Sequence, residues 1–148
     1  MTKIHRPQTG TLRWHEVDVL AYKADDGTPF RSVTRQVLFD DPAFASQLRY
    51  FEIGPGGHTT LERHEHAHAV VIQRGRGRCL VGTRVCAVAP HDLVHVPAMT
   101  WHQFRADPDA PLGFLCMVDA KRDRPQLPTA RDVEELRADP ELARFIRV

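Results

Sequence analysis

The chain has 148 residues, 42% of them hydrophobic, which suits one domain with a buried core. Its 20 Lys and Arg residues against 19 Asp and Glu give a net charge of +1, so charge offers no basis for binding nucleic acid or an anionic membrane. No apolar run approaches the roughly 20 residues of a membrane span, and residues 1–7 lack the apolar core of a signal peptide. We therefore expect a cytoplasmic protein with no nucleic-acid or membrane partner.

Short segments typical of β-strands fill most of the chain after a polar arm at residues 1–10. Turns rich in Gly, Pro and Asp separate them, and one such turn is expected at 25–27. Many short strands with this punctuation indicate an all-β sandwich or barrel. The expected strands cover residues 12–22, 32–39, 47–53, 58–73, 78–81, 84–89, 93–96, 101–105 and 112–118.

The C-terminal residues 121–148 differ from the rest, because helix-start signals replace the strand pattern. Thr129 with Asp132 has the spacing of a capping box. Asp139 followed by Pro140 suits an N-cap and a first helical position. We expect two short helices that pack on the barrel or on a partner subunit.

The three cysteines show none of the Cys-x-x-Cys spacing of a metal site. A two-residue hairpin turn at 82–83 would place Cys79 opposite Cys86, and we interpret both as reduced, small apolar residues. Cys116 lies in the apolar run 114–118, which assigns it to the core rather than to nucleophilic chemistry.

Four side chains that can bind metals alternate along one expected strand: Glu62, His64, His66 and His68. Successive side chains of a strand point to opposite faces, so these four would share a face. Carboxylate and neutral imidazole are ligands for Zn, Fe, Mn, Ni or Cu. The segment therefore predicts a metal site, and His102, on a strand distant in sequence, would complete it across a barrel lumen.

The segment resembles the first of two motifs that define the cupin superfamily, written G-x5-H-x-H-x3,4-E-x6-G. A match that starts at Gly56 places Glu62 and His64 at the two histidines, His68 at the glutamate and Gly75 at the closing glycine. The matched residues are thus still three histidines and one carboxylate once His102 is included. Relative to the motif, however, the carboxylate of Glu62 takes a histidine position and His68 takes the glutamate position. We favour this register because both glycines then fall where the backbone needs freedom.

A second register, starting at His58, would pair His64 with His66 but would place Val70 at the glutamate. His66 therefore falls outside the favoured set, and we expect it to support the site rather than to bind the metal. His58 and His95 are candidates for acid–base groups at the mouth of the pocket.

The second cupin motif, G-x5-P-x-G-x2-H-x3-N, matches at Pro97 and His102. His91, Met99 and Ala106 replace its two glycines and its asparagine. The missing glycines are tolerable if the two turns keep negative φ angles, which residues with a Cβ atom adopt readily.

The resemblance implies an all-β fold, a double-stranded β-helix (jelly-roll) cupin barrel with short C-terminal helices. It implies a single cupin domain over residues 1–148, with the barrel at about 11–119 and the helical tail at about 121–148. It further implies a homodimer and one divalent transition metal per chain, which is Fe, Mn, Ni, Zn or Cu. The expected metal ligands are Glu62, His64, His68 and His102.

Similar cupins include dioxygenases, so the resemblance implies a metal-dependent enzyme that acts on a small organic substrate, with dioxygenase-type oxidoreduction favoured. Glu62 would be the catalytic residue and would leave the metal to accept a substrate proton. One alternative is a non-redox isomerase, lyase or decarboxylase whose metal polarises a carbonyl. Another is a non-enzymatic cupin that binds a small ligand.

Further expectations concern the surroundings of the metal. Trp101 would supply an apolar wall, and Arg49 or Tyr50 would reach a substrate anion or hydroxyl. Because a metal binds deprotonated imidazole, its affinity should fall as the pH drops through about 6.5, the pKa of an unperturbed histidine.

Overall fold

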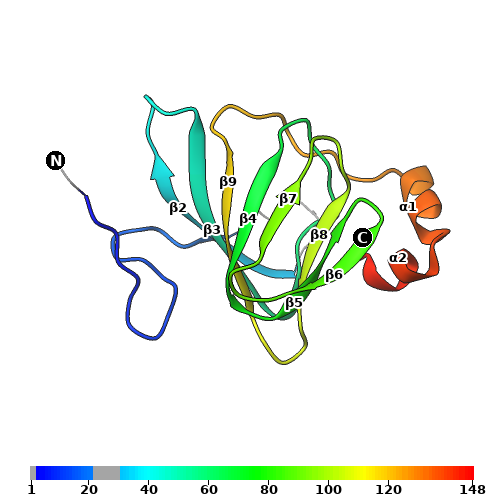
Figure 1. Cartoon of the computed structure of the whole chain (residues 1–148), viewed down its shortest axis with the longest axis horizontal. Helices are drawn as coiled ribbons and strands as arrows, with labels where there is room; N and C mark the ends of the chain where they lie inside the picture. Colours follow the sequence, from blue (N-terminus) through cyan, green and yellow to red (C-terminus); the bar gives the residue numbers. More distant parts are fainter. Residues whose placement is uncertain (1–2, 22–30) are drawn as a thin grey trace.

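The computed structural model describes residues 3–21 and 31–148, so the turn expected at 25–27 lies outside the described residues. This part of the chain contains nine strands and two helices (Figure 1). The strands are β1 (Leu20–Ala21), β2 (Arg31–Asp40), β3 (Ser46–His58), β4 (His68–Gly75), β5 (Gly77–Val81), β6 (Arg84–Val88), β7 (Leu93–Val96), β8 (His102–Ala106) and β9 (Leu112–Asp119), and the helices are α1 (Ala130–Arg137) and α2 (Pro140–Phe145).

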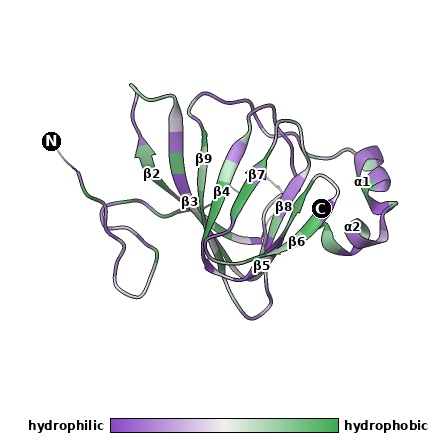
Figure 2. Ribbon diagram, viewed as in Figure 1, coloured by the Kyte–Doolittle hydropathy of each residue, from purple (hydrophilic) through white to green (hydrophobic). Residues whose placement is uncertain are grey.

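The strands form a curled antiparallel sheet with the two helices at one side (Figure 1). Along the sheet the order is β6-β5-β8-β3-β9-β4-β7, while β2 also pairs with β3 and β1 pairs with β2. Hydrophobic and hydrophilic residues alternate along β3, as expected for a strand with one face turned to a core (Figure 2). This architecture confirms the predicted all-β jelly-roll fold.

The long strand β3 joins the two halves of the curled sheet. Its residues 46–53 pair with β9, while His58 at its end pairs with Arg105 of β8. The prediction that this strand stops at Ile53 is therefore wrong. The backbone continues through a bend in which Gly56 has a φ of 72°, a conformation that costs glycine little because it has no Cβ atom.

The pairing register defines the concave side of the sheet, because directly paired residues share a face. Phe51 of β3 lies opposite Phe114 of β9, which in turn lies opposite Ile72 of β4. The rings of Phe51 and Phe114 stack with 5.6 Å between their centroids. The core that continues from these pairs comprises Val33, Phe51, Ile53, Val70, Ile72, Cys79, Val88, Phe104, Ala106, Leu112, Phe114, Cys116 and Val118.

The segment expected to be a strand at 12–22 is mostly irregular. In its described part only Leu20–Ala21 pairs with β2. The Gln36 side chain fixes the irregular part of this segment by two hydrogen bonds. Its amide oxygen accepts from the Trp14 N–H at 3.0 Å, and its nitrogen donates to the Leu12 carbonyl at 2.9 Å. This side chain thus satisfies backbone groups that a strand would have paired in a ladder.

The two C-terminal helices begin where their capping residues predict. Thr129 and Asp132 form the expected capping box, and Asp139 caps α2 with Pro140 following it. Helix α2 packs on the barrel, which decides between the two packing partners left open by the sequence. The contact between α2 and the barrel is made by Leu61, Leu80, Leu142, Phe145 and Ile146. Within the described ranges, neither helix has the length and apolar character to cross a membrane.

Replacement of Gly75 by alanine should destabilise the barrel strongly. Gly75 has a φ of 79°, and a Cβ atom there would overlap the Pro111 carbonyl. The left-handed backbone alone costs about 1–3 kcal/mol for a residue with a Cβ atom, and the overlap adds to this. Gly56→Ala is the control, because its φ of 72° is similar but nothing lies within 4 Å of the added Cβ. Urea unfolding should show the larger loss for Gly75→Ala, and equal losses would contradict this account.

Candidate metal centre

The segment that carries the expected ligands is a loop over residues 59–67, not part of a continuous strand at 58–73. Strand β3 ends at His58, and β4 begins at His68. Between them the backbone of Glu62 pairs with that of His102 in β8, with N···O distances of 3.2 and 3.0 Å. The shared strand face proposed for the alternating ligands is therefore wrong, and the loop brings them together instead.

Three histidines converge inside the barrel, and they come from three different elements. One ring nitrogen each from His64 of the loop, His68 of β4 and His102 of β8 all lie within 4.8 Å of one another. The ring centroids are 4.8 to 5.1 Å apart. Three imidazoles that converge in this way can hold a divalent metal and leave coordination positions open.

The hydrogen bonds of the three rings leave a lone pair on each for a metal. Nδ1 of His64 lies 2.6 Å from the His66 carbonyl, and Nδ1 of His102 lies 2.9 Å from the Thr100 carbonyl. A carbonyl only accepts, so both Nδ1 atoms carry the proton and both Nε2 atoms are acceptors. Nε2 of His68 is buried and has no hydrogen-bond partner among the described residues. A buried, unpaired acceptor is costly, and a bound metal would satisfy it.

Burial keeps these imidazoles neutral. It lowers the pKa of His68 to about 2, with repulsion from His102 and His64 adding to the effect. It lowers the pKa of His102 to about 4, although the Glu62 carboxylate acts in the opposite direction. The pKa of His64 is also lowered, again mainly by burial. Protons should therefore compete with a metal only well below pH 6.5, the value expected for an unperturbed ring.

Glu62 lies beside the three histidines but outside the group whose donor atoms converge. Its side chain is buried and lines the same cavity. Its Oε2 accepts a hydrogen bond from the Thr60 hydroxyl at 2.5 Å. The assignment of Glu62 as a ligand and as the catalytic residue remains a prediction. The Glu62 carboxylate acts to raise the pKa of His102, because its negative charge stabilises the protonated ring.

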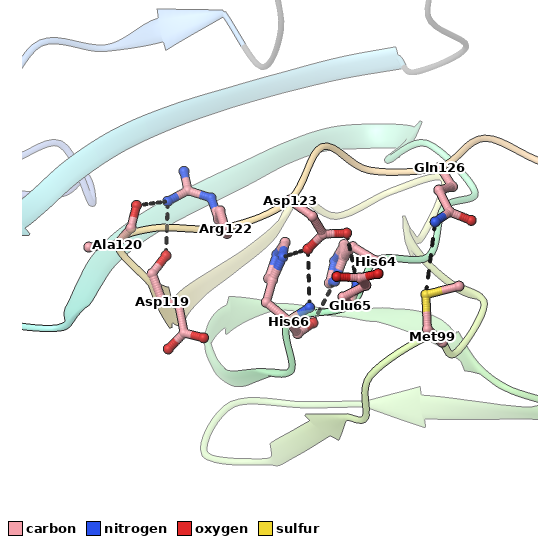
Figure 3. Close-up of polar contacts among 9 residues, drawn as sticks. All are labelled: His64, Glu65, His66, Met99, Asp119, Ala120, Arg122, Asp123 and Gln126. Atoms are coloured by element: carbon pink, nitrogen blue, oxygen red, sulfur yellow. Dashed lines mark hydrogen bonds and ion pairs between the residues drawn. The ribbon is translucent and has the colours of Figure 1, made fainter.

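His66 supports the site from behind, with Asp123 as its partner (Figure 3). Its ring stacks on that of His64 at 3.7 Å with an interplanar angle of 3°, and its Nδ1 lies 2.6 Å from Asp123 Oδ1. Burial acts to raise the pKa of Asp123, but hydrogen bonds from the Glu65 N–H and from His66 lower it to about 2. Sequence reasoning missed Asp123, because it lies in a segment without any motif.

The two glycine positions of the second motif adopt positive φ angles although neither is glycine. His91 has a φ of 78° and Met99 a φ of 54°, so the condition of negative φ angles at these turns is not met. The Met99 N–H donates to the His64 carbonyl at 2.7 Å, and the His91 N–H donates to the Ile72 carbonyl at 2.9 Å. Such strained residues persist only where their surroundings hold them, and Met99 is held against the histidine loop.

The histidines line a cavity of about 180 Å³. Phe104, not Trp101 as expected, supplies an apolar wall, whereas the Trp101 ring lies under the Arg63 guanidinium at 4.4 Å. Arg49 lines the cavity, but Tyr50 is turned away and packs on Trp14. The described lining residues, which include neither His58 nor His95, are Arg35, Arg49, Phe51, Thr59, Glu62, His64, His66, His68, His102, Phe104, Phe114, Cys116, Arg122 and Pro125.

Cys116 is buried in the core, as predicted, but it also lines this cavity. Its Sγ lies 3.1 Å from Nδ1 of His68 and 3.5 Å from Nη2 of Arg49. Burial raises the pKa of its thiol, while the Arg49 charge acts against that increase. Cys79 and Cys86 lie opposite each other in the β5–β6 hairpin as free thiols, as predicted, and neither lines the cavity.

A curled jelly-roll sheet with three convergent histidines that could hold a metal defines a barrel of the cupin type. A sequence profile described as "Cupin domain" matches residues 49–118. The chain is also 60% identical over 141 residues to the 1-methylthio-D-xylulose 5-phosphate methylsulfurylase of Rhodospirillum rubrum, with 95% of this chain and 90% of that protein covered. The chain therefore belongs to the cupin family.

Solved structures agree with this assignment. A cupin 2 conserved barrel domain protein from Rhodopseudomonas palustris superposes with a TM-score of 0.93 at 53% identity, over 99% of this chain and 100% of that one. A cupin-2 domain protein from Rhodospirillum rubrum gives 0.87 at 60% identity, over 95% and 94%. The polyketide cyclase RemF from Streptomyces resistomycificus gives 0.75 at 22% identity over 99% of each chain, which shows the fold alone.

The stability of the metal-free protein should fall as the pH is lowered from 6.5 toward 4. In this range the unfolded chain protonates its histidines, whereas the folded chain keeps His68 and His102 neutral. The unfolded state then binds more protons, so the free energy of unfolding decreases with decreasing pH, by at most about 1.4 kcal/mol per pH unit for each such histidine. Denaturant titrations at several pH values measure the slope. His102→Gln should reduce it, and an unchanged slope would contradict the assignment.

Asp123→Asn should weaken metal binding about tenfold, the lower range for residues that orient metal ligands. The neutral amide holds the His66 ring less firmly, and His66 contributes both the stacked ring and the carbonyl that position His64. Competition with a chelator measures the affinity. Asp119→Asn is the matched control, since its contact with the neighbouring Arg122 uses the backbone carbonyl. Equal affinities in the two variants would count against a positioning role for Asp123.

Proposed function

We propose that this chain is a metal-dependent enzyme, independent of dioxygen, that removes the methylthio group from 1-methylthio-D-xylulose 5-phosphate or a closely similar phosphorylated ketose at the expense of a thiol reductant. The relative from Rhodospirillum rubrum is named for that substrate and is 60% identical over 95% of this chain. The observation that carries the proposal is the position of Cys116, whose thiol shares one cavity with the three convergent histidines. The favoured dioxygenase prediction has no such support, and the alternative in which the metal polarises a carbonyl fits better.

The donor set suits a divalent transition metal. His64, His68 and His102 would hold it through their Nε2 lone pairs, and the orphaned Nε2 of His68 fits this role best. When bound, the metal supplies a Lewis acid that polarises the substrate carbonyl. The aromatic side chains at the cavity wall exclude water from this position.

Cys116 is placed to accept the methylthio group. In a ketose with a methylthio group on C1 and a carbonyl on C2, the thiolate attacks the thioether sulfur. The new S–S bond forms as the C1–S bond breaks, and the released electron pair moves toward the C2 carbonyl before a proton is added at C1. The products are a 1-deoxyketose phosphate and a methyl disulfide on Cys116, which a small thiol reductant returns to the free thiol by disulfide exchange.

Arg49 and His68 prepare the thiol for this attack. The Arg49 guanidinium lies 3.5 Å from Cys116 Sγ and favours the thiolate by its charge. Nδ1 of His68 lies 3.1 Å from the same sulfur and can donate a hydrogen bond to it. The same ring would thus offer Nε2 to a metal and Nδ1–H to the thiolate, which couples the two reacting centres in a single side chain.

Turnover of 1-methylthio-D-xylulose 5-phosphate with metal and a thiol reductant should proceed under strictly anaerobic conditions. Cys116→Ser should reduce the rate at least about 10³-fold, a typical loss for a nucleophile, without loss of metal. Cys86→Ser is the matched control, because Cys86 is exposed and outside the cavity. Mass spectrometry should detect a methylthio adduct on Cys116 when the reductant is omitted. A requirement for dioxygen, or full activity of Cys116→Ser, would refute the proposal.

A further inference from the structure

Three arginine side chains line the same cavity as the histidines: Arg35, Arg49 and Arg122. Arg35 of β2 lies opposite Phe51, and Arg49, two residues before Phe51 on β3, lies opposite Cys116 of β9. The register therefore puts Arg35 and Arg49 on the concave face, next to the thiol. Arg122 comes from the segment that follows β9, where Figure 3 shows it adjacent to Asp123.

The positive charge of these arginines exceeds the negative charge around the cavity. Among the described lining residues, Glu62 is the one carboxylate. Nη1 of Arg122 donates to the backbone carbonyls of Asp119 and Ala120 at 3.1 and 3.4 Å, which carry no net charge. Arg122 lines the same cavity as Arg49 and Arg35, and desolvation, with repulsion from both added to it, lowers the pKa of Arg122.

Arg49 is held in place by groups that leave its charge available. Its guanidinium carbon lies 4.9 Å from the centroid of the Phe51 ring, and Nη2 donates to Cys116 Sγ. Its Nε is buried without a hydrogen-bond partner among the described residues. A buried donor of this kind carries a desolvation cost that an anion in the cavity would remove.

We propose that Arg35, Arg49 and Arg122 form a subsite for a phosphate monoester dianion, which fixes the end of the substrate remote from the thioether. The inference rests on the proposed function for the identity of the rest of the substrate. Guanidinium groups bind phosphate oxygens through paired N–H donors, and a dianion relieves the repulsion among three of them. The phosphate then orients the ketose so that its other end faces Cys116 and the histidines.

Binding of inorganic phosphate tests the subsite without reference to catalysis. Isothermal titration of the full-length protein should show phosphate binding that Arg122→Gln weakens about tenfold or more, as expected for a lost charge-assisted contact. Arg124→Gln is the matched control, since it removes the same charge two residues away in an exposed residue that does not line the cavity. Arg35→Gln should weaken binding as Arg122→Gln does. No binding to the wild type, or equal losses in Arg122→Gln and Arg124→Gln, would overturn the subsite.

Kinetics separate the subsite from the proposed function. Arg122→Gln should raise KM for 1-methylthio-D-xylulose 5-phosphate about tenfold or more and leave KM for unphosphorylated 1-methylthio-D-xylulose unchanged. Equal effects on both substrates would overturn the subsite while the function stood. If the protein has no activity on either compound but loses phosphate binding in Arg122→Gln and not in Arg124→Gln, the subsite stands and the proposed function fails.

Discussion

The candidate site depends on one pair of backbone hydrogen bonds between the loop 59–67 and β8. The Glu62 N–H donates to the His102 carbonyl at 3.2 Å, and the His102 N–H donates to the Glu62 carbonyl at 3.0 Å. This bridge connects the loop 59–67 to β8 and places His64 beside His102. His68 of β4 lies next to both of them. Glu62 thus has a backbone role that is independent of its side chain.

Burial has opposite consequences for the two kinds of cationic group around the cavity. An imidazole responds to desolvation by losing its proton, so His64, His68 and His102 become neutral and ready to bind a metal. A guanidinium does not lose its proton near neutral pH, so the half-buried Arg49 keeps a charge that an anion would stabilise, while Arg122 presents its charge from an exposed position. One low-dielectric cavity therefore prepares a metal centre and an anion subsite side by side, and aromatic rings from β3, β8 and β9 maintain it.

Local signals in the sequence predicted most of the strands and both helix starts, because alternation and capping depend on neighbouring residues. They failed where a distant contact overrides local preference. The Gln36 side chain keeps the segment around Trp14 out of a strand, and the bridge to β8 converts residues 59–67 into a loop. His64, His68 and His102 could still be chosen from the motif. Asp123 could not, because nothing in a charged segment without periodicity indicates which carboxylate meets a histidine.

The segment after β9 combines two tasks on consecutive residues, Arg122 at the cavity and Asp123 on His66 (Figure 3). Arg35 and Arg49 lie on paired strands, so their backbone is fixed whether or not an anion is present. Arg122 lies outside the sheet, and an anion that holds it also holds the residue that orients the histidine loop. Linkage then requires that any effect of a metal held by that loop on the affinity for an anion at Arg122 equals the effect of the anion on the affinity for the metal. A substrate with phosphate at one end and a carbonyl for the metal at the other would gain from both.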